Sequence, residues 1–415
     1  MGILLSRPGK ARLSSRPLGV LLAFLLAACG LRSAPPRAPR VPVPAAPVAE
    51  VVKTATGSMA PLQCSVSDIG FRLLRDLARS RTGDVVISPA SAAVALSLLH
   101  DAASERDAAR LRELLGLSQL GSEACTTNAE ALREMLLRPG NGVSSRAAMA
   151  FWIPLDPPAR PDFARIARGR YKARLTALDL GQPSGRAAVD RWFSWATAAE
   201  RPAAPETPPG GVMVGATTAL VHAEWADPFP AHGTTEGSFT RADGTVRRLP
   251  MMRHRTVARV AEIDSCQRID LPLGRGEVSL TLLIPATRTG LGRLIDNLSP
   301  DTWAAATLRG RFAQVDLSLP KLELQDTARL DQVLGITGLD VSGAVPGSLR
   351  LGPVWMVTPM TIDEYGLNTP PPLVPPSELR PAAAGKPERI AADRPFVFVV
   401  AQAAGSMPLY AGVVR

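Results

Sequence analysis

The sequence is poor in the side chains that most enzyme and metal sites use. Its 415 residues include four cysteines and four histidines. No histidine has a partner at the spacing of a zinc motif. The sequence also contains no G-x-S-x-G nucleophile elbow, no P-loop and no G-x-G-x-x-G turn after a strand. We therefore expect no metal, no cofactor and no catalytic activity.

Concentrated positive charge is absent as well. The formal net charge is +10, but it comes almost entirely from single, scattered arginines without interleaved aromatic residues. This distribution is typical of a solvated surface and does not predict nucleic-acid binding.

Long apolar runs are missing except near the start. Leu18–Ala28 follows four positive residues and is too short for a stable membrane span. Its end, Leu26-Ala27-Ala28-Cys29, is similar to the lipobox of bacterial lipoproteins, in which the cysteine is acylated and the chain is cut before it. An ordinary signal peptide is the alternative. Gly30 is not the aspartate that retains such proteins at the inner membrane, so the resemblance implies an exported bacterial protein at the outer membrane, on its periplasmic face or at the cell surface.

The remaining cysteines, Cys64, Cys125 and Cys266, cannot all pair. Export permits a disulfide, and Cys64–Cys125 is the candidate.

Composition divides the chain into three parts. We expect a lipoprotein signal peptide at 1–28 and a proline-rich tether at 29–62, which lacks large apolar residues to bury. One domain should follow at 63–415. Helical patterns dominate its first half and apolar or alternating strand patterns its second half, which favours an α+β fold.

Several motifs of this domain resemble serpins, the serine protease inhibitor family. They are, in order, ISPAS before an apolar helix, VDRWFSWAT, LVHAEWADPF with LPMMRH, VDLSLPKLEL with LGIT, TIDEYG, and DRPFVFVV with PLYAGVV. The resemblance implies a helical N-terminal half packed on three mainly antiparallel sheets. It also implies a monomer with an exposed reactive loop, here about 366–392, as bait for a serine protease. Membrane contact would be through the lipid on Cys29 alone.

In inhibitory serpins the cleaved loop inserts as a central strand of the main sheet and traps the protease. The start of the loop, the hinge, corresponds to Glu364, Gly366, Leu367, Asn368, Thr369, Pro370, Pro371 and Pro372. The family has small residues after the glycine. Three prolines instead remove three N–H donors, and proline is excluded from central strands. Unpaired acceptors at about 1–3 kcal/mol each would cost several kcal/mol.

Other family positions also differ. The shutter, where the sheet opens, corresponds to Ser88, Ser91, Thr217 and Met356, the last two replacing the family's asparagine and histidine. Pro359 interrupts the strand before the hinge. Counting from Gly366 places the bait residue at Arg380, but Pro381 follows it; counting back from Pro395-Phe396 places it between Pro381 and Ala384. The bait candidates are therefore Arg380, Pro381, Ala382 and Ala384.

The sequence thus predicts an exported, serpin-like lipoprotein with impaired covalent trapping and a non-trapping binding or decoy role. The alternative is a working suicide inhibitor of a trypsin-like or other serine or cysteine protease.

Overall fold

The computed structural model describes residues 65–118, 130, 132–134, 142–197, 208, 210–263, 265–368, 386–402 and 407–415. All of them belong to one compact unit, Val51–Arg415. The predicted signal peptide, Cys29, the tether, the Cys64–Cys125 pair and the bait candidates lie outside the described residues. Among the described residues, no helix combines the length and the apolar composition needed to cross a bilayer.

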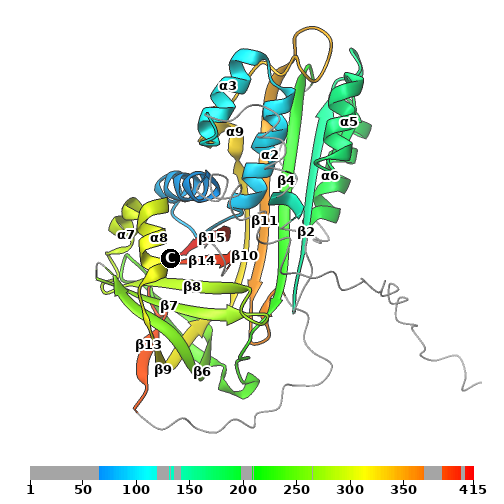
Figure 1. Ribbon diagram of the computed structural model, residues 1–415. Helices are drawn as coiled ribbons and strands as arrows, with labels where there is room; N and C mark the ends of the chain where they lie inside the picture. Colours follow the sequence, from blue (N-terminus) through cyan, green and yellow to red (C-terminus); the bar gives the residue numbers. More distant parts are fainter. Residues whose placement is uncertain are drawn as a thin grey trace, which may run out of the picture. The chain divides into compact units, whose positions relative to one another are not determined.

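Two hydrogen-bonded sheets form the framework (Figure 1). The six-stranded sheet has the order β10 (Leu322–Arg329), β11 (Arg350–Ile362), β12 (Gly366–Leu367), β4 (Val212–Glu224), β2 (Val143–Ile153) and β3 (Arg174–Ala177). The nine-stranded sheet contains β1 (Val85–Ile87), β15 (Pro408–Val414), β14 (Phe396–Gln402), β8 (Val278–Pro285), β7 (Cys266–Leu273), β6 (Val246–Ile263), β9 (Arg311–Pro320) and β13 (Glu388–Ala391) in that order, with β5 (Thr235–Thr240) paired to β6.

The resemblance implied three sheets, whereas the described part of the chain forms two hydrogen-bonded sheets. The reason is β6, a strand of 18 residues that pairs with β7 along its second half, with β5 along its first, and with β9 between them. This continuous strand joins what the family resemblance implied to be separate sheets.

The helices are residues 65–80, α2 (Pro89–Ala102), α3 (Glu105–Leu114), α5 (Pro161–Gly169), α6 (Pro183–Thr197), α7 (Leu291–Asn297), α8 (Pro300–Leu308) and α9 (Leu330–Val333). Most of them lie in the first half of the domain, where the sequence favours helices. The VDLSLPKLEL run divides into β9 and β10 at Lys321.

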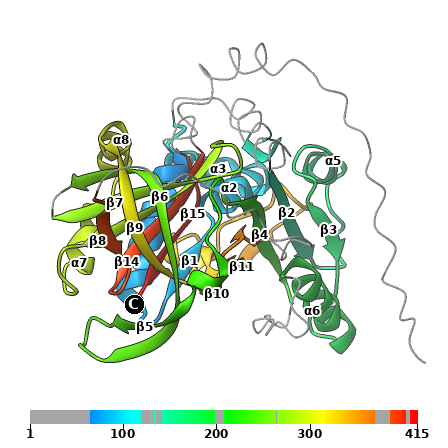
Figure 2. The ribbon, with the colours of Figure 1, turned by 90° about the horizontal axis from the view of Figure 1, so that it is seen from below.

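Helices α2 and α6 cover opposite faces of the six-stranded sheet. Helix α2 is buried on nearly every side, as its all-round apolar sequence requires, and packs against both β4 and β15 (Figure 2). Alternate residues of β11 separate the two faces: Met356 belongs to the main core, and Trp355 packs with Trp192 and Phe193 of α6. Ring centroids of these aromatic neighbours lie 5.3–5.9 Å apart. Helix α6 therefore holds β4 and β11 together from outside.

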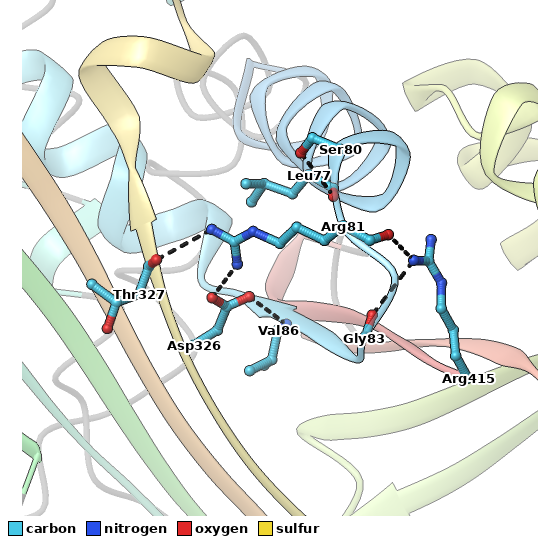
Figure 3. Close-up of polar contacts among 8 residues, drawn as sticks. All are labelled: Leu77, Ser80, Arg81, Gly83, Val86, Asp326, Thr327 and Arg415. Atoms are coloured by element: carbon cyan, nitrogen blue, oxygen red, sulfur yellow. Dashed lines mark hydrogen bonds and ion pairs between the residues drawn. The ribbon is translucent and has the colours of Figure 1, made fainter. Parts of the chain in front are cut away.

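A polar network attaches the outer strand β10 to the rest of this unit (Figure 3). The Arg81 guanidinium, after helix 65–80, pairs with Asp326 and donates to the Thr327 carbonyl at 3.2 Å. Asp326 also accepts from the Val86 amide of β1 at 3.3 Å, and Arg415 donates to the Arg81 carbonyl. Asp326 is 9% exposed and Arg81 is 34% exposed, so the loss of Arg81 would leave a largely buried carboxylate without its charge partner.

Candidate functional site: the hinge and the split between β4 and β11

The two central strands of the six-stranded sheet are paired along only part of their length. Their parallel ladder begins at Arg350–Val212 and ends at Val357–Thr218. Beyond it, β12 lies between them, with Leu367 opposite both Ile362 of β11 and Ala223 of β4. We call the unpaired stretch, residues 358–362 of β11 and 219–224 of β4, the split. The first residues of the predicted hinge therefore already occupy one end of it.

Gly366 allows the chain to enter the split. Its φ is +150°, and a Cβ there would lie 2.1 Å from the Ala223 carbonyl oxygen. Only glycine tolerates so close a backbone approach. Leu367 follows as a buried side chain, 1% exposed, that belongs to the main core, while its backbone lies between the two strands.

Glu364 fixes the turn before Gly366. Its carboxylate accepts from Thr234 at 2.5 Å and pairs with Lys321 Nζ at 2.7 Å. Burial by itself would raise the pKa of Glu364, but the hydrogen bonds from Lys321 and Thr234 outweigh it and hold this pKa below its usual value. Trp225 supports the same turn by donating from Nε1 to the Asp363 carbonyl at 2.7 Å. The hinge is thus held by a charge pair and an indole at the mouth of the split.

Asn368 joins the two edges of the split through its backbone and side chain. Its amide donates to the Thr361 carbonyl at 2.9 Å, and its Oδ1 accepts from the Thr361 amide at 2.7 Å. Its Nδ2 donates to the Val221 carbonyl of β4 at 2.7 Å, and its own carbonyl accepts from His222 Nδ1. The residue has φ +52°, a left-handed conformation that a continuing strand cannot keep. Asn368 therefore links both edges of the split in a conformation that is not that of a strand.

Tyr410 of β15 closes the next part of the split from the nine-stranded sheet. Its hydroxyl donates to the Ala219 carbonyl at 2.8 Å and accepts from the Val221 amide at 2.8 Å. Burial raises the pKa of this hydroxyl, so it stays protonated and able to donate. Together, Tyr410 and Asn368 satisfy three backbone groups of β4 that an additional strand would otherwise pair.

The predicted shutter residues lie together at the end of the split where the β4–β11 ladder stops. Thr217 is directly opposite Met356 in the parallel register and donates to the Ser91 carbonyl at 3.5 Å. Ser88 caps α2, and its hydroxyl also donates to the Leu409 carbonyl of β15 at 3.0 Å. These four side chains are all buried. Asn368 makes polar contacts to both edges of the split, Tyr410 bonds to the β4 edge alone, and Met356 supplies only apolar surface.

Pro359 removes a donor from the β11 edge of the split. Thr361 directs its N–H and C=O toward the split, and the residue two positions earlier faces the same side because strand groups alternate. That residue is Pro359, which has no N–H. If the β12 register were continued, Pro370 would stand opposite Pro359 and Pro371 opposite Ala219. On the β11 side, neither Pro370 nor Pro359 could donate a backbone hydrogen bond to the other. On the β4 side, Pro371 would offer no N–H to the Ala219 carbonyl.

Comparison with known proteins shows the family. The family model described as "Serpin (serine protease inhibitor)" matches residues 65–415. Serpin-Z2A of Oryza sativa subsp. japonica is 27% identical over 400 residues, with 82% of this chain and 93% of the relative covered. Alpha-1-antitrypsin 1-4 of Mus musculus is 22% identical, with 84% and 87% covered. The chain belongs to the serpin family.

Solved structures show the same fold. Human thyroxine-binding globulin complexed with thyroxine superposes with a TM-score of 0.79 at 20% identity, over 86% of this chain and 98% of that chain. The thermophilic serpin tengpin in its native state gives 0.76 at 19%, over 85% and 93%. Uncleaved ovalbumin gives 0.76 at 17%, over 85% and 98%.

The structure places some predicted site residues and leaves others outside its described part. The predicted hinge residues Glu364, Gly366, Leu367 and Asn368 lie in one described segment at the end of the split. Thr369, Pro370 to Pro372, Arg380, Pro381, Ala382 and Ala384 lie outside the described residues. The sequence reasoning missed Tyr410; the available signal was a hydroxyl within the apolar run PLYAGVV, since a buried tyrosine hydroxyl needs a partner. The described residues contain no group of three or more His, Cys, Asp or Glu side chains that could hold a metal.

Proposed function

We propose that this serpin engages a serine protease through its reactive loop without trapping it by loop insertion, as a binding partner or a cleavable decoy. The observation that carries the proposal is the closed split. Asn368 has a left-handed conformation through which a strand cannot continue, and Tyr410 already bonds to the edge of β4 that an inserted loop would need.

The energetic case follows from the proline positions. In the extended register, Pro370 and Pro372 would face β11 and Pro371 would face β4, leaving three buried carbonyl acceptors without donors. At roughly 1–3 kcal/mol each, the penalty is about 3–9 kcal/mol. Insertion would also have to remove the Tyr410 hydroxyl from the Ala219 carbonyl and the Val221 amide. A trapping serpin must insert before the acyl bond to the protease is hydrolysed, so this cost favours simple cleavage.

A denaturing gel tests the proposal directly. The full chain is incubated with a trypsin-like and an elastase-like protease, and we expect a cleaved product without a band at the summed mass. A stable band at that mass would establish the alternative, a working suicide inhibitor, and overturn the proposal.

A matched variant tests the cause. Replacing Pro370, Pro371 and Pro372 by alanine together restores three N–H donors. After cleavage of the loop, we expect this variant to gain more thermal stability than the cleaved wild type, because only its loop can donate backbone hydrogen bonds at 370–372. Equal melting shifts would show that the prolines do not limit insertion.

We also propose that the protein is exported and lipid-anchored through Cys29, with 29–62 as tether and a monomeric domain beyond it. The support is the four-residue lipobox pattern and the positive segment before it. Radiolabelled palmitate should enter the wild type in a bacterial host and not the Cys29→Ser variant. Label in both would contradict lipidation at this residue.

A further inference from the structure

A cavity of about 490 Å³ lies between the ends of β6, β7 and β8 in the nine-stranded sheet and helices α7 and α8. Its walls come from the ends of β6 and β8, the start of β7, the turn after β8, and one side of each helix. This volume is within the range of roughly 300–1,000 Å³ that takes drug-sized ligands. The cavity is remote from the hinge in the sequence and shares no lining residue with it.

The inner wall is apolar and already organised. Leu283, Leu294 and Trp303 line it. The Trp303 ring packs edge-on against Phe71, with centroids 5.9 Å apart. The Arg268 guanidinium also lies 5.6 Å from the Trp303 ring centroid. An aromatic side chain held by two neighbours gives a ligand a rigid apolar surface, which lowers the entropy cost of binding.

The charges near the cavity leave one cation available. Arg268 is paired with Asp270, with two nitrogen–oxygen distances of 2.9 Å, and Asp296 of α7 is paired with Arg79 at 2.7 Å. Arg293 is the single charged side chain among the described lining residues, and it makes no ion pair there. Asn297 adds an amide to the same rim. An apolar interior beneath an unpaired guanidinium is complementary to an apolar molecule that carries one negative charge.

We propose that this cavity binds a small amphipathic carboxylate, with its ring or chain against Trp303 and its carboxylate at Arg293. The activity goes beyond protease engagement and does not depend on whether the loop inserts. The loss of either function would therefore leave the other measurable.

Isothermal titration calorimetry of the full chain with naphthaleneacetate tests the site, with naphthaleneethanol as the neutral probe of the same shape. We expect saturable binding of the acid, at least about fivefold tighter than the alcohol. The Arg293→Gln variant should bring the acid down to the affinity of the alcohol. Arg288→Gln removes an exposed arginine from the neighbouring turn outside the cavity lining and should leave both affinities unchanged.

A blocking variant tests the location. Ala306 lines the interior from α8, and Ala306→Phe should weaken both probes at least about tenfold by filling the space. Since this substitution can disturb the core, Thr289→Trp, at an exposed rim position, provides a second block that spares the core. No saturable binding at millimolar probe, equal affinity for acid and alcohol, or unchanged binding in Thr289→Trp would each overturn the proposal.

Discussion

The Tyr410 hydroxyl offers the sharpest test of how the sheet is closed. The substitution Tyr410→Phe removes one oxygen and leaves the ring in place. The Ala219 carbonyl then lacks a donor and the Val221 amide lacks an acceptor, both in the interior. A buried unsatisfied group costs about 1–3 kcal/mol, and the phenylalanine recovers part of this because no hydroxyl is desolvated. We expect the free energy of unfolding to fall by about 2–4 kcal/mol.

Urea unfolding monitored by far-ultraviolet circular dichroism measures this loss. The matched control is Tyr365→Phe, since the Tyr365 hydroxyl has no hydrogen-bond partner within the described residues; it should change the unfolding free energy by less than about 0.5 kcal/mol. A Tyr410→Phe variant as stable as that control would show that the hydroxyl does not secure the edge of β4, and the closed split would lose its main support.

Three further outcomes follow from the hinge. In Asn368→Ala, the side-chain bonds to the Thr361 amide and the Val221 carbonyl are lost and the left-handed conformation is less favourable, so we expect a loss of about 2–3 kcal/mol in urea unfolding; a neutral substitution would contradict its bridging role. In Gly366→Ala, the Cβ would collide with the Ala223 carbonyl oxygen, so β12 should leave the sheet and limited proteolysis within 366–392 should accelerate at least about tenfold; an unchanged cleavage rate would show that the hinge is not held there. The lowered pKa of Glu364 means that its stabilisation is complete above its unfolded pKa of about 4.3 and disappears as pH falls through the lower folded value. Glu364→Gln should therefore be less stable than the wild type at pH 7 and approach it near pH 3, as measured by thermal melting; a stability difference independent of pH would refute the charge-pair account.

Local patterns in the sequence predicted most of the described elements that surround the hinge. Strands β1, β4, β8, β11 and β14 are apolar or alternating runs bounded by turn residues, and α2 is a dense run of small apolar residues. These signals depend on neighbours along the chain, so they can be found without a structure. The short helix α8 was missed because PDTWAAATL has no amphipathic repeat and is fixed instead by its capping box at Ser299.

The residues of the candidate site also differ in how much of their role the sequence alone reveals. Gly366 and the three prolines could be interpreted from the sequence because the missing Cβ and the missing N–H are properties of the residues themselves. Tyr410 could not be assigned, since its partners lie on β4, 189 and 191 positions away in the chain. The α7–α8 cavity also depends on packing between separate elements, which no single segment encodes.

The sequence by itself determined the serpin resemblance, the hinge position and the inability of residues 370–372 to donate backbone hydrogen bonds, because each is a property of residue type and order. Only the tertiary structure decided which strands receive the first hinge residues and which groups contact their edges. Asn368 bonds to both β11 and β4, and Tyr410 bonds to β4 from the nine-stranded sheet. Hydrogen bonds between such distant residues exist only once the chain has folded.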